Sequence, residues 1–216
     1  MKKRIVIFDL DGTLLNTIED LTDSTNFVLS VFNFPQKTKN QICQYIGDGL
    51  SKLIERAIPD GKNNPKFEKC LDLFKKHYKD NMFNKTKPYP NIIRMLKKIK
   101  NLGIKTAVVS NKFDDAVKIL CKKYFEGLID YCAGENEQNG IRKKPAPDAV
   151  LRILNKFGIS ENEAIYIGDS DVDIATAKNS NIECISVLWG VKDKKFLLEN
   201  GAKTIISKPD EIYNYL

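Results

Sequence analysis

Short runs of apolar residues alternate along the chain with longer segments of helical periodicity. Each run is apolar almost throughout, which is typical of strands buried on both faces of a parallel sheet. Five such runs predict strands at residues 4–8, 105–109, 164–167, 184–188 and 204–206.

Two of the intervening segments carry apolar residues at helical spacing. Residues 91–102 end before Gly103 and residues 148–157 end before Gly158, and glycine commonly follows the last turn of a helix. The predicted apolar faces are Ile92, Met95, Leu96 and Ile99 in the first helix, and Val150, Leu151, Leu154 and Phe157 in the second. Strands that alternate with such helices predict an α/β fold with a doubly wound, mainly parallel sheet.

The segment from Thr17 to about Lys87 contains no convincing strand but several sets of helically spaced apolar residues. We therefore predict a small α-helical cap at residues 16–85, inserted after the first strand. The α/β core then comprises residues 1–15 and 86–216. The Thr17-x-x-Asp20 sequence is typical of a capping box and predicts how the first cap helix begins.

The composition is that of an ordinary globular protein, with 42% hydrophobic and 29% charged residues. No apolar run approaches the roughly 20 residues of a membrane helix, and the run at residues 5–8 is too short for a signal peptide. We therefore expect a cytoplasmic protein with no membrane partner. The five cysteines are scattered and include no C-x-x-C pair, which favours neither a disulfide framework nor a zinc site.

The formal net charge of +7 reflects 35 basic and 28 acidic residues. Only five of the basic residues are arginine, the side chain best suited to phosphate forks and base edges, and the lysines are mixed with acids. We expect no nucleic-acid partner, although a positive field would attract a small anionic substrate. The single histidine, His77, disfavours Ser-His-Asp catalysis and histidine-rich metal centres.

Polar residues follow three of the predicted strands, in the form of Asp9, Ser110 and Asp169. Ligands of an open parallel sheet bind beyond the carboxyl ends of its strands, so these side chains converge if the three strands are neighbours. Asp9 and Asp11 are two residues apart and precede a glycine that permits a tight turn, so both can enter one cleft. The same Asp-Gly pattern also occurs in plain turns.

Four segments, in order, resemble the motifs of the haloacid dehalogenase superfamily of phosphohydrolases. The helical insert between the first and second motifs also matches the place of that family's small cap, so the resemblance covers essentially the whole chain. The segments are Asp9-Leu10-Asp11-Gly12-Thr13-Leu14, Val108-Val109-Ser110-Asn111-Lys112, Lys144-Pro145-Ala146-Pro147 and Ile167-Gly168-Asp169-Ser170-Asp171-Val172-Asp173.

The resemblance implies catalytic roles for the first three motifs. Asp9 would attack phosphorus and form an aspartyl-phosphate, and Asp11 would protonate the leaving alkoxide and later take a proton from water. Ser110 would hold the phosphoryl oxygens, and Lys144 would neutralise charge in the transition state. Thr13 and Asn111 are further expected substrate contacts.

The resemblance also implies a metal site. Asp9, the backbone carbonyl of Asp11, and Asp169 would bind Mg2+, a hard ion that suits carboxylate and carbonyl oxygens. Asp173 would orient a bound water or Lys144 from behind these ligands.

Within the superfamily, the chain is most similar to the phosphoglycolate phosphatases, on residues 9–26, 46–50, 87–90 and 187–190. A small phosphorylated metabolite, 2-phosphoglycolate first, is therefore the expected partner of a monomer or homodimer. Gly47 and Gly49 would bring a cap loop close to that molecule, or would simply form an interhelical turn.

Other functions on the same scaffold stay open. A phosphomutase similar to β-phosphoglucomutase would share the aspartyl-phosphate, but the chain lacks a clear cap histidine after the first motif. A phosphatase for a sugar phosphate or a nucleoside monophosphate is a further alternative. A dehalogenase is disfavoured by the second acid, Asp11, and a non-catalytic binding protein by the presence of Asp9, Asp11, Lys144 and Asp169 together.

Overall fold

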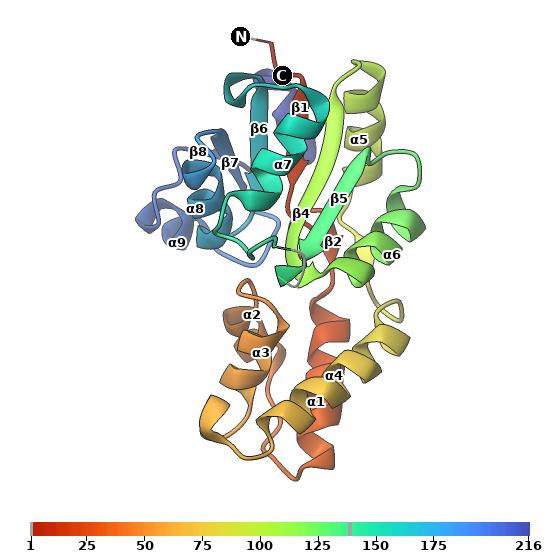
Figure 1. Cartoon of the computed structure of the whole chain (residues 1–216), viewed down its shortest axis with the longest axis vertical. Coiled ribbons are helices and arrows are strands. Elements are labelled where there is room, and N and C mark those ends of the chain that lie inside the picture. Colours follow the sequence, from red (N-terminus) through yellow and green to blue (C-terminus); the bar gives the residue numbers. More distant parts are fainter. Residues whose placement is uncertain (1, 138–139) are drawn as a thin grey trace. The chain divides into compact units, whose positions relative to one another are not determined.

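The computed structural model describes residues 2–137 and 140–216, and the chain divides into two compact units (Figure 1). One unit comprises Met1–Leu15 and Pro88–Leu216, and the other comprises Asn16–Lys87. The chain thus returns to the first unit at Pro88. The sequence predicts this return at residue 86.

The larger unit contains a six-stranded parallel sheet with the strand order β5-β4-β1-β6-β7-β8, flanked by helices (Figure 1). This arrangement confirms the predicted α/β fold. Its strands are β1 (Ile5–Phe8), β4 (Lys105–Phe113), β5 (Tyr131–Glu135), β6 (Ala164–Gly168), β7 (Glu183–Val187) and β8 (Thr204–Ile206). Its helices are α5 (Ile92–Asn101), α6 (Asp114–Phe125), α7 (Asp148–Phe157), α8 (Asp171–Asn179) and α9 (Lys194–Glu199), with 3-10 turns at Glu161–Glu163 and Pro209–Tyr215.

Both faces of the central strands β4, β1 and β6 are buried, as the continuous apolar runs predict. Ile5 and Ile7 on one face of β1 pack in a core cluster with residues of α7 and α8, while the alternate residues Val6 and Phe8 are equally inaccessible. Because successive side chains of a strand point to opposite faces, both sides of β1 are covered.

The predicted apolar face of α7 is wrong at one position. Leu151 is 37% exposed, and Ile153 is buried in its place. The buried face therefore follows the spacing of Val150, Ile153 and Leu154, which are neighbours on one side of a helix. The predicted face of α5 is confirmed, since Ile92, Met95, Leu96 and Ile99 are all buried.

The strand β5 has no counterpart among the predicted strands. Its sequence, Tyr-Cys-Ala-Gly-Glu, has no β-branched residue and contains a glycine, so it carries little strand signal. Packing explains the glycine, because a Cβ on Gly134 would lie 2.4 Å from the Cα of Asp114 at the start of α6.

The smaller unit is helical. Its elements are α1 (Ile18–Val31), α2 (Lys39–Tyr45), α3 (Leu50–Ala57), a 3-10 turn at Gly61–Asn63, and α4 (Phe67–Asn81). The short strands β2 (Leu15–Asn16) and β3 (Lys87–Pro88), where the chain passes between the units, pair as a two-stranded sheet. Within residues 2–137 and 140–216, no helix combines the length and apolar character that crossing a membrane requires.

The predicted capping box at the start of α1 is wrong. Thr17 does precede the helix, but its side chain makes no capping hydrogen bond. The carboxylate of Asp20 instead accepts hydrogen bonds from the backbone N–H groups of Lys85 (3.0 Å) and Thr86 (2.8 Å). Asp20 therefore satisfies backbone donors that lie more than 60 residues later in the sequence, which a local pattern cannot reveal.

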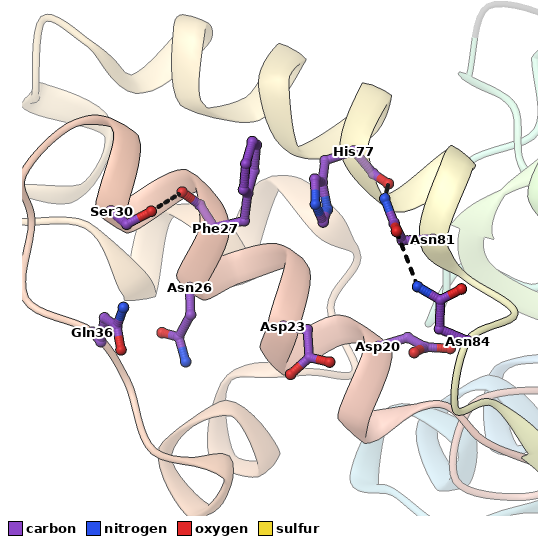
Figure 2. Close-up of a pocket in the computed structure, with 9 residues that line it drawn as sticks. All are labelled: Asp20, Asp23, Asn26, Phe27, Ser30, Gln36, His77, Asn81 and Asn84. Carbon is purple, nitrogen blue, oxygen red and sulfur yellow. Dashed lines mark hydrogen bonds between the residues drawn. The ribbon is translucent and has the colours of Figure 1, made fainter.

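A polar hollow of about 460 Å³ lies on the smaller unit between α1, α4 and the segment after α1 (Figure 2). The ring of Phe27 stacks on the ring of His77, with 4.0 Å between centroids, and His77 Nδ1 lies 3.1 Å from Ser24 Oγ. The side chain of Asn26 bonds to the Lys37 backbone, and Asp23 pairs with Lys85. These groups are thus engaged within the unit. The full lining is Asp20, Asp23, Asn26, Phe27, Ser30, Gln36, His77, Asn81 and Asn84.

Candidate active site

The strands β4, β1 and β6 are neighbours in the sheet, so their carboxyl ends lie side by side. Phe8 of β1 is in register with Val108 of β4 and with Ile167 of β6. The residues that follow these three positions therefore emerge at one edge of the sheet. The N–H of Asp9 donates to the carbonyl oxygen of Ile167 at 2.9 Å, which fixes the start of the first polar loop.

Two glycines allow this loop to pack closely around Asp169. Gly12 has a φ of +89°, and a Cβ there would lie 2.4 Å from Asp169 Oδ2. A Cβ on Gly190, in the loop after β7, would lie 2.4 Å from Asp169 Cβ and 2.5 Å from the Gly12 carbonyl oxygen. No other residue fits either position without displacing the Asp169 carboxylate or the loop around it.

The ammonium group of Lys144 lies between two carboxylates. Its Nζ is 2.7 Å from Asp9 Oδ1, 2.7 Å from Asp173 Oδ1 and 3.2 Å from the Tyr166 hydroxyl, and its side chain is almost fully buried. Burial by itself lowers the pKa of Lys144, but Asp173 and Asp9 outweigh it and raise that pKa well above its ordinary value. Lys144 is therefore a permanent cation in the site.

The same environment acts differently on Asp9. Burial raises the pKa of Asp9 well above its ordinary value; Lys144 opposes this shift, and the charges of Asp173 and Asp169 add to it. An additional positive charge beside Asp9 would therefore be needed to keep it fully ionised.

The backbone at Lys144 is held by Asn111. The Lys144 N–H donates to Asn111 Oδ1 at 2.7 Å, and Asn111 Nδ2 donates to the Lys144 carbonyl oxygen at 3.1 Å. The sequence predicts that Asn111 contacts substrate, whereas in the structure its amide positions the lysine segment. A substrate contact by Asn111 stays a prediction.

Asp173 is fully buried, and both of its carboxylate oxygens are engaged. Oδ1 accepts from Lys144, while Oδ2 accepts from the N–H groups of Asp169 and Ser170 and, at 2.7 Å, from Ser170 Oγ. These bonds form a capping box at the start of α8. Asp173 thus anchors Lys144 to the first turn of α8.

Asp169 is held by two donors. Thr13 Oγ1 donates to Asp169 Oδ1 at 3.2 Å, and the Val191 N–H donates to Oδ2 at 2.8 Å. Burial, followed by the charge of Asp173, raises the pKa of Asp169 to about 7. Thr13 is fully buried, so its hydroxyl serves this carboxylate; the expected contact between Thr13 and substrate stays a prediction.

Asp11 pairs with Lys112, a residue that is not among the predicted site residues. Lys112 Nζ lies 3.0 Å from Asp11 Oδ2, and the Lys112 side chain is only 1% exposed. Tyr166, which touches Lys144, is likewise missing from the predicted site. A lysine in a lysine-rich chain and a tyrosine inside an apolar strand give little sequence signal of a functional contact.

The remaining predicted site residues are Ser110 in the larger unit and Gly47 and Gly49 in the smaller unit. Ser110 is buried, its Oγ accepts from the Lys112 N–H at 3.2 Å, and it follows Val108 of β4, which is in register with Phe8 of β1. Gly47 and Gly49 belong to the smaller unit, in the loop between α2 and α3, with φ of +117° and +88°. Their conformation accounts for glycine there, and their contact with substrate stays a prediction.

The chemistry of the donors fits a divalent cation. Carboxylate oxygens of Asp9, Asp169 and Asp173 lie within 4.8 Å of one another, and all three residues are buried. Asp11 Oδ1 is also buried and has no hydrogen-bond partner among the described residues. Together these four acids exceed the ammonium groups of Lys112 and Lys144 by two charges when all are ionised. Asp173 Oδ1 binds the Lys144 ammonium group and Oδ2 accepts three hydrogen bonds, whereas each oxygen of Asp169 accepts one from the described residues. Asp9 and Asp169 are therefore better placed as ligands.

Residues 6–187 match the model of the haloacid dehalogenase-like hydrolase family, and the chain belongs to this family. The predicted family is thereby confirmed. A phosphoglycolate phosphatase of Aquifex aeolicus is 34% identical over 189 residues, covering 87% of this chain and 85% of that protein. Phosphoglycolate phosphatase 1 of Pseudomonas aeruginosa is 30% identical, covering 94% and 76%. The family and these relatives confirm the predicted class of enzyme, a phosphoric monoester hydrolase.

Solved structures agree with this assignment. The crystal structure of a candidate phosphoglycolate phosphatase from Lactobacillus delbrueckii subsp. bulgaricus superimposes with a TM-score of 0.94 at 32% identity, covering 100% of this chain and 98% of that one. A predicted phosphoglycolate phosphatase from Haemophilus somnus gives a TM-score of 0.91 at 26% identity, covering 100% and 98%.

Proposed function

We propose that this protein is a Mg2+-dependent phosphatase that hydrolyses 2-phosphoglycolate through an aspartyl-phosphate on Asp9. The observation that carries the mechanism is the buried contact of Asp9 with Lys144. This contact lies at the carboxyl end of the parallel strands, where Asp11 and Asp169 also lie. The choice of substrate rests on the relatives, which are named phosphoglycolate phosphatases at 34% and 30% identity.

Asp9, Asp169 and the backbone carbonyl of Asp11 would hold the metal ion. Bound Mg2+ would offset the negative charges of the acids and of the phosphate group, so that a carboxylate can approach phosphorus. The excess of carboxylates over ammonium groups at this site, and the buried cluster of Asp9, Asp169 and Asp173, support this assignment.

In the first step, Asp9 forms a bond to phosphorus as the bond between phosphorus and the ester oxygen breaks. Lys144 holds Asp9 Oδ1, so Oδ2 is the oxygen available for attack. Asp11 donates a proton to the departing alkoxide, which leaves as the alcohol. Lys144 counters the negative charge that develops on the transferred group, as a fixed cation in a buried site does best.

In the second step, Asp11 takes a proton from water as the water oxygen attacks phosphorus. The bond between phosphorus and Asp9 breaks, which releases inorganic phosphate and restores the carboxylate of Asp9. Ser110, in the neighbouring strand β4, would bind phosphoryl oxygens in both steps.

The proposal is tested by assaying purified protein for phosphate release from a panel of phosphorylated metabolites. The panel contains 2-phosphoglycolate, sugar phosphates and nucleoside monophosphates, each with Mg2+ and with EDTA. We expect the highest kcat/KM for 2-phosphoglycolate and loss of activity in EDTA that Mg2+ restores. Equal activity in EDTA would contradict the metal assignment, and a higher kcat/KM for another ester would change the substrate.

The panel also includes glucose 1-phosphate with its products separated. A phosphomutase would yield glucose 6-phosphate, whereas a phosphatase yields glucose and inorganic phosphate. We expect no glucose 6-phosphate, because we propose that water is the acceptor of the phosphoryl group.

A further inference from the structure

Lys112 is a buried cation beside the residue proposed to carry the proton. Its ammonium nitrogen lies 3.0 Å from Asp11 Oδ2, and its side chain is 1% exposed, whereas that of Asp11 is 20% exposed. A buried ammonium group is costly unless a charged partner compensates it, so the pair with Asp11 is a fixed feature of the folded site.

The end of β4 explains how a lysine reaches this position. The register of β4 against β5 shifts between Val109 and Phe113, so the last residues of β4 leave the regular ladder. The Lys112 N–H turns back to Ser110 Oγ at 3.2 Å. Close packing fixes the backbone, because a Cβ on Gly134 of β5 would lie 2.6 Å from the Lys112 carbonyl oxygen.

The two oxygens of Asp11 have different environments. Oδ2 is held by Lys112, while Oδ1 is buried and has no hydrogen-bond partner in the part of the chain that the structure describes. The terminal torsion of an aspartate is broad and nearly two-fold, so the carboxylate rotates readily unless one oxygen is fixed. Fixing Oδ2 therefore also fixes the direction of Oδ1.

We propose that Lys112 is a positioning residue that holds Asp11 so that Oδ1 exchanges the proton with the leaving group and with water. This inference rests on the proposed function, in which the ester oxygen leaves phosphorus as an alkoxide and receives its proton from Asp11. Lys112 itself donates no proton in the reaction. It acts through Asp11, whose misplacement by about 1 Å would cost about 10²-fold in rate.

Esters with different leaving groups distinguish positioning of Asp11 by Lys112 from a general structural role of Lys112. An alkyl phosphate such as 2-phosphoglycolate releases a strongly basic alkoxide that needs a proton as it departs. 4-Nitrophenyl phosphate releases nitrophenolate, a stable anion that needs none. A residue that positions the general acid therefore affects the alkyl ester far more than the aryl ester.

The experiment compares kcat for 2-phosphoglycolate and 4-nitrophenyl phosphate in wild type, Lys112→Met, Asp11→Asn and the double variant. Lys105→Met is the matched control, since Lys105 lies on the same strand and pairs with Asp130 through an exposed contact at the other end. We expect Lys112→Met to lower kcat for the alkyl ester about 10²-fold, and at least about tenfold more than for the aryl ester. Lys105→Met should leave both values unchanged.

Two further results are expected. In the Asp11→Asn background, Lys112→Met should lower kcat for the alkyl ester no further, because the two residues act as one unit. Lys112→Gln, which retains an N–H donor toward Asp11, should recover part of the alkyl activity. The double variant removes both members of the ion pair and leaves no lone buried charge, so it also covers the case in which Lys112→Met does not fold.

Equal losses for the two esters would overturn the proposal in favour of a structural role. A rise in KM for 2-phosphoglycolate at unchanged kcat would overturn it in favour of direct binding of the substrate carboxylate. Failure of the proposed function is distinguishable, because wild type itself would then release no phosphate from 2-phosphoglycolate. In that case the best alkyl ester of the metabolite panel takes its place in the comparison.

Discussion

Asp169 shows how burial and neighbouring charge prepare a single side chain for a cation. Thr13 and the Val191 N–H each donate to its carboxylate, and both interactions favour the ionised form. Burial and the charge of Asp173 nevertheless prevail, and the pKa of Asp169 is raised to about 7. The folded, metal-free site therefore holds a proton that the unfolded chain releases at lower pH.

This shift predicts an unusual pH dependence of stability. Below about pH 4, Asp169 is protonated in both the folded and the unfolded protein. Between about pH 4 and pH 7 it is protonated only in the folded protein, so folding binds a proton. The stabilisation is complete at low pH and is lost as the pH rises through about 7. We expect the unfolding free energy of the metal-free protein to fall by up to a few kcal/mol more across this window than that of Asp169→Asn.

Urea unfolding in EDTA at a series of pH values measures this difference. Added Mg2+ should stabilise wild type more at pH 8 than at pH 5, because the proposed metal site would require ionised acids. Parallel pH profiles for wild type and Asp169→Asn would show that Asp169 titrates normally.

The convergence of Asp9 and Asp169 could be predicted from the sequence because each directly follows a strand of a parallel sheet. Tyr166 and Lys112 could not, because their roles depend on burial and on distances set by distant segments. Lys112 lies within the segment that resembles the second family motif, residues 108–112. Nothing in the residue pattern shows that Lys112 is buried against Asp11. The same holds for Asn111, whose amide holds the Lys144 backbone.

At the level of elements, the strands that carry dense apolar runs could be predicted, while β5 and the extension of β4 could not. Residues 110–113 contain Ser, Asn and Lys, which resemble a loop, yet they continue β4 through a register shift. The predicted capping box at the start of α1 is wrong for a related reason. The Asp20 carboxylate accepts hydrogen bonds from the backbone N–H groups of residues 85 and 86. Local patterns do not include such distant partners.

The loop after β7 gives a prediction at this scale. A Cβ on Gly190 would meet both Asp169 and the Gly12 carbonyl oxygen, so Gly190→Ala must push the two loops apart. We expect Gly190→Ala to weaken Mg2+ binding about tenfold or more, as is typical when the groups that orient metal ligands are disturbed. Isothermal titration with Mg2+ measures the change.

Gly103→Ala is the matched control for that substitution. Gly103 follows α5 with a φ of +73°, and an added Cβ has nothing within 4 Å. It should cost about 1 kcal/mol of stability through backbone strain and leave Mg2+ affinity unchanged. Equal Mg2+ affinities in Gly190→Ala and wild type would show that the loop does not set the position of Asp169.

At the scale of the whole molecule, the net charge of +7 should assist the capture of an anionic substrate. We expect kcat/KM for 2-phosphoglycolate to fall severalfold as KCl rises from about 0.02 to about 0.3 M, because salt shortens the range of the field. The value of kcat should change little, since the buried contacts of Lys144 are poorly screened. Initial rates at constant Mg2+ test this, and a kcat/KM independent of salt would assign the positive charge to solubility alone.

The central claim is that Asp9 becomes phosphorylated during turnover. Borohydride reduces an aspartyl-phosphate to homoserine, so the enzyme can be quenched with borohydride during turnover of 2-phosphoglycolate with Mg2+ and analysed by peptide mass spectrometry. We expect homoserine at position 9, only when substrate and Mg2+ are both present and never in Asp9→Asn. Rapid release of phosphate with unmodified Asp9, or modification at another aspartate, would contradict this account.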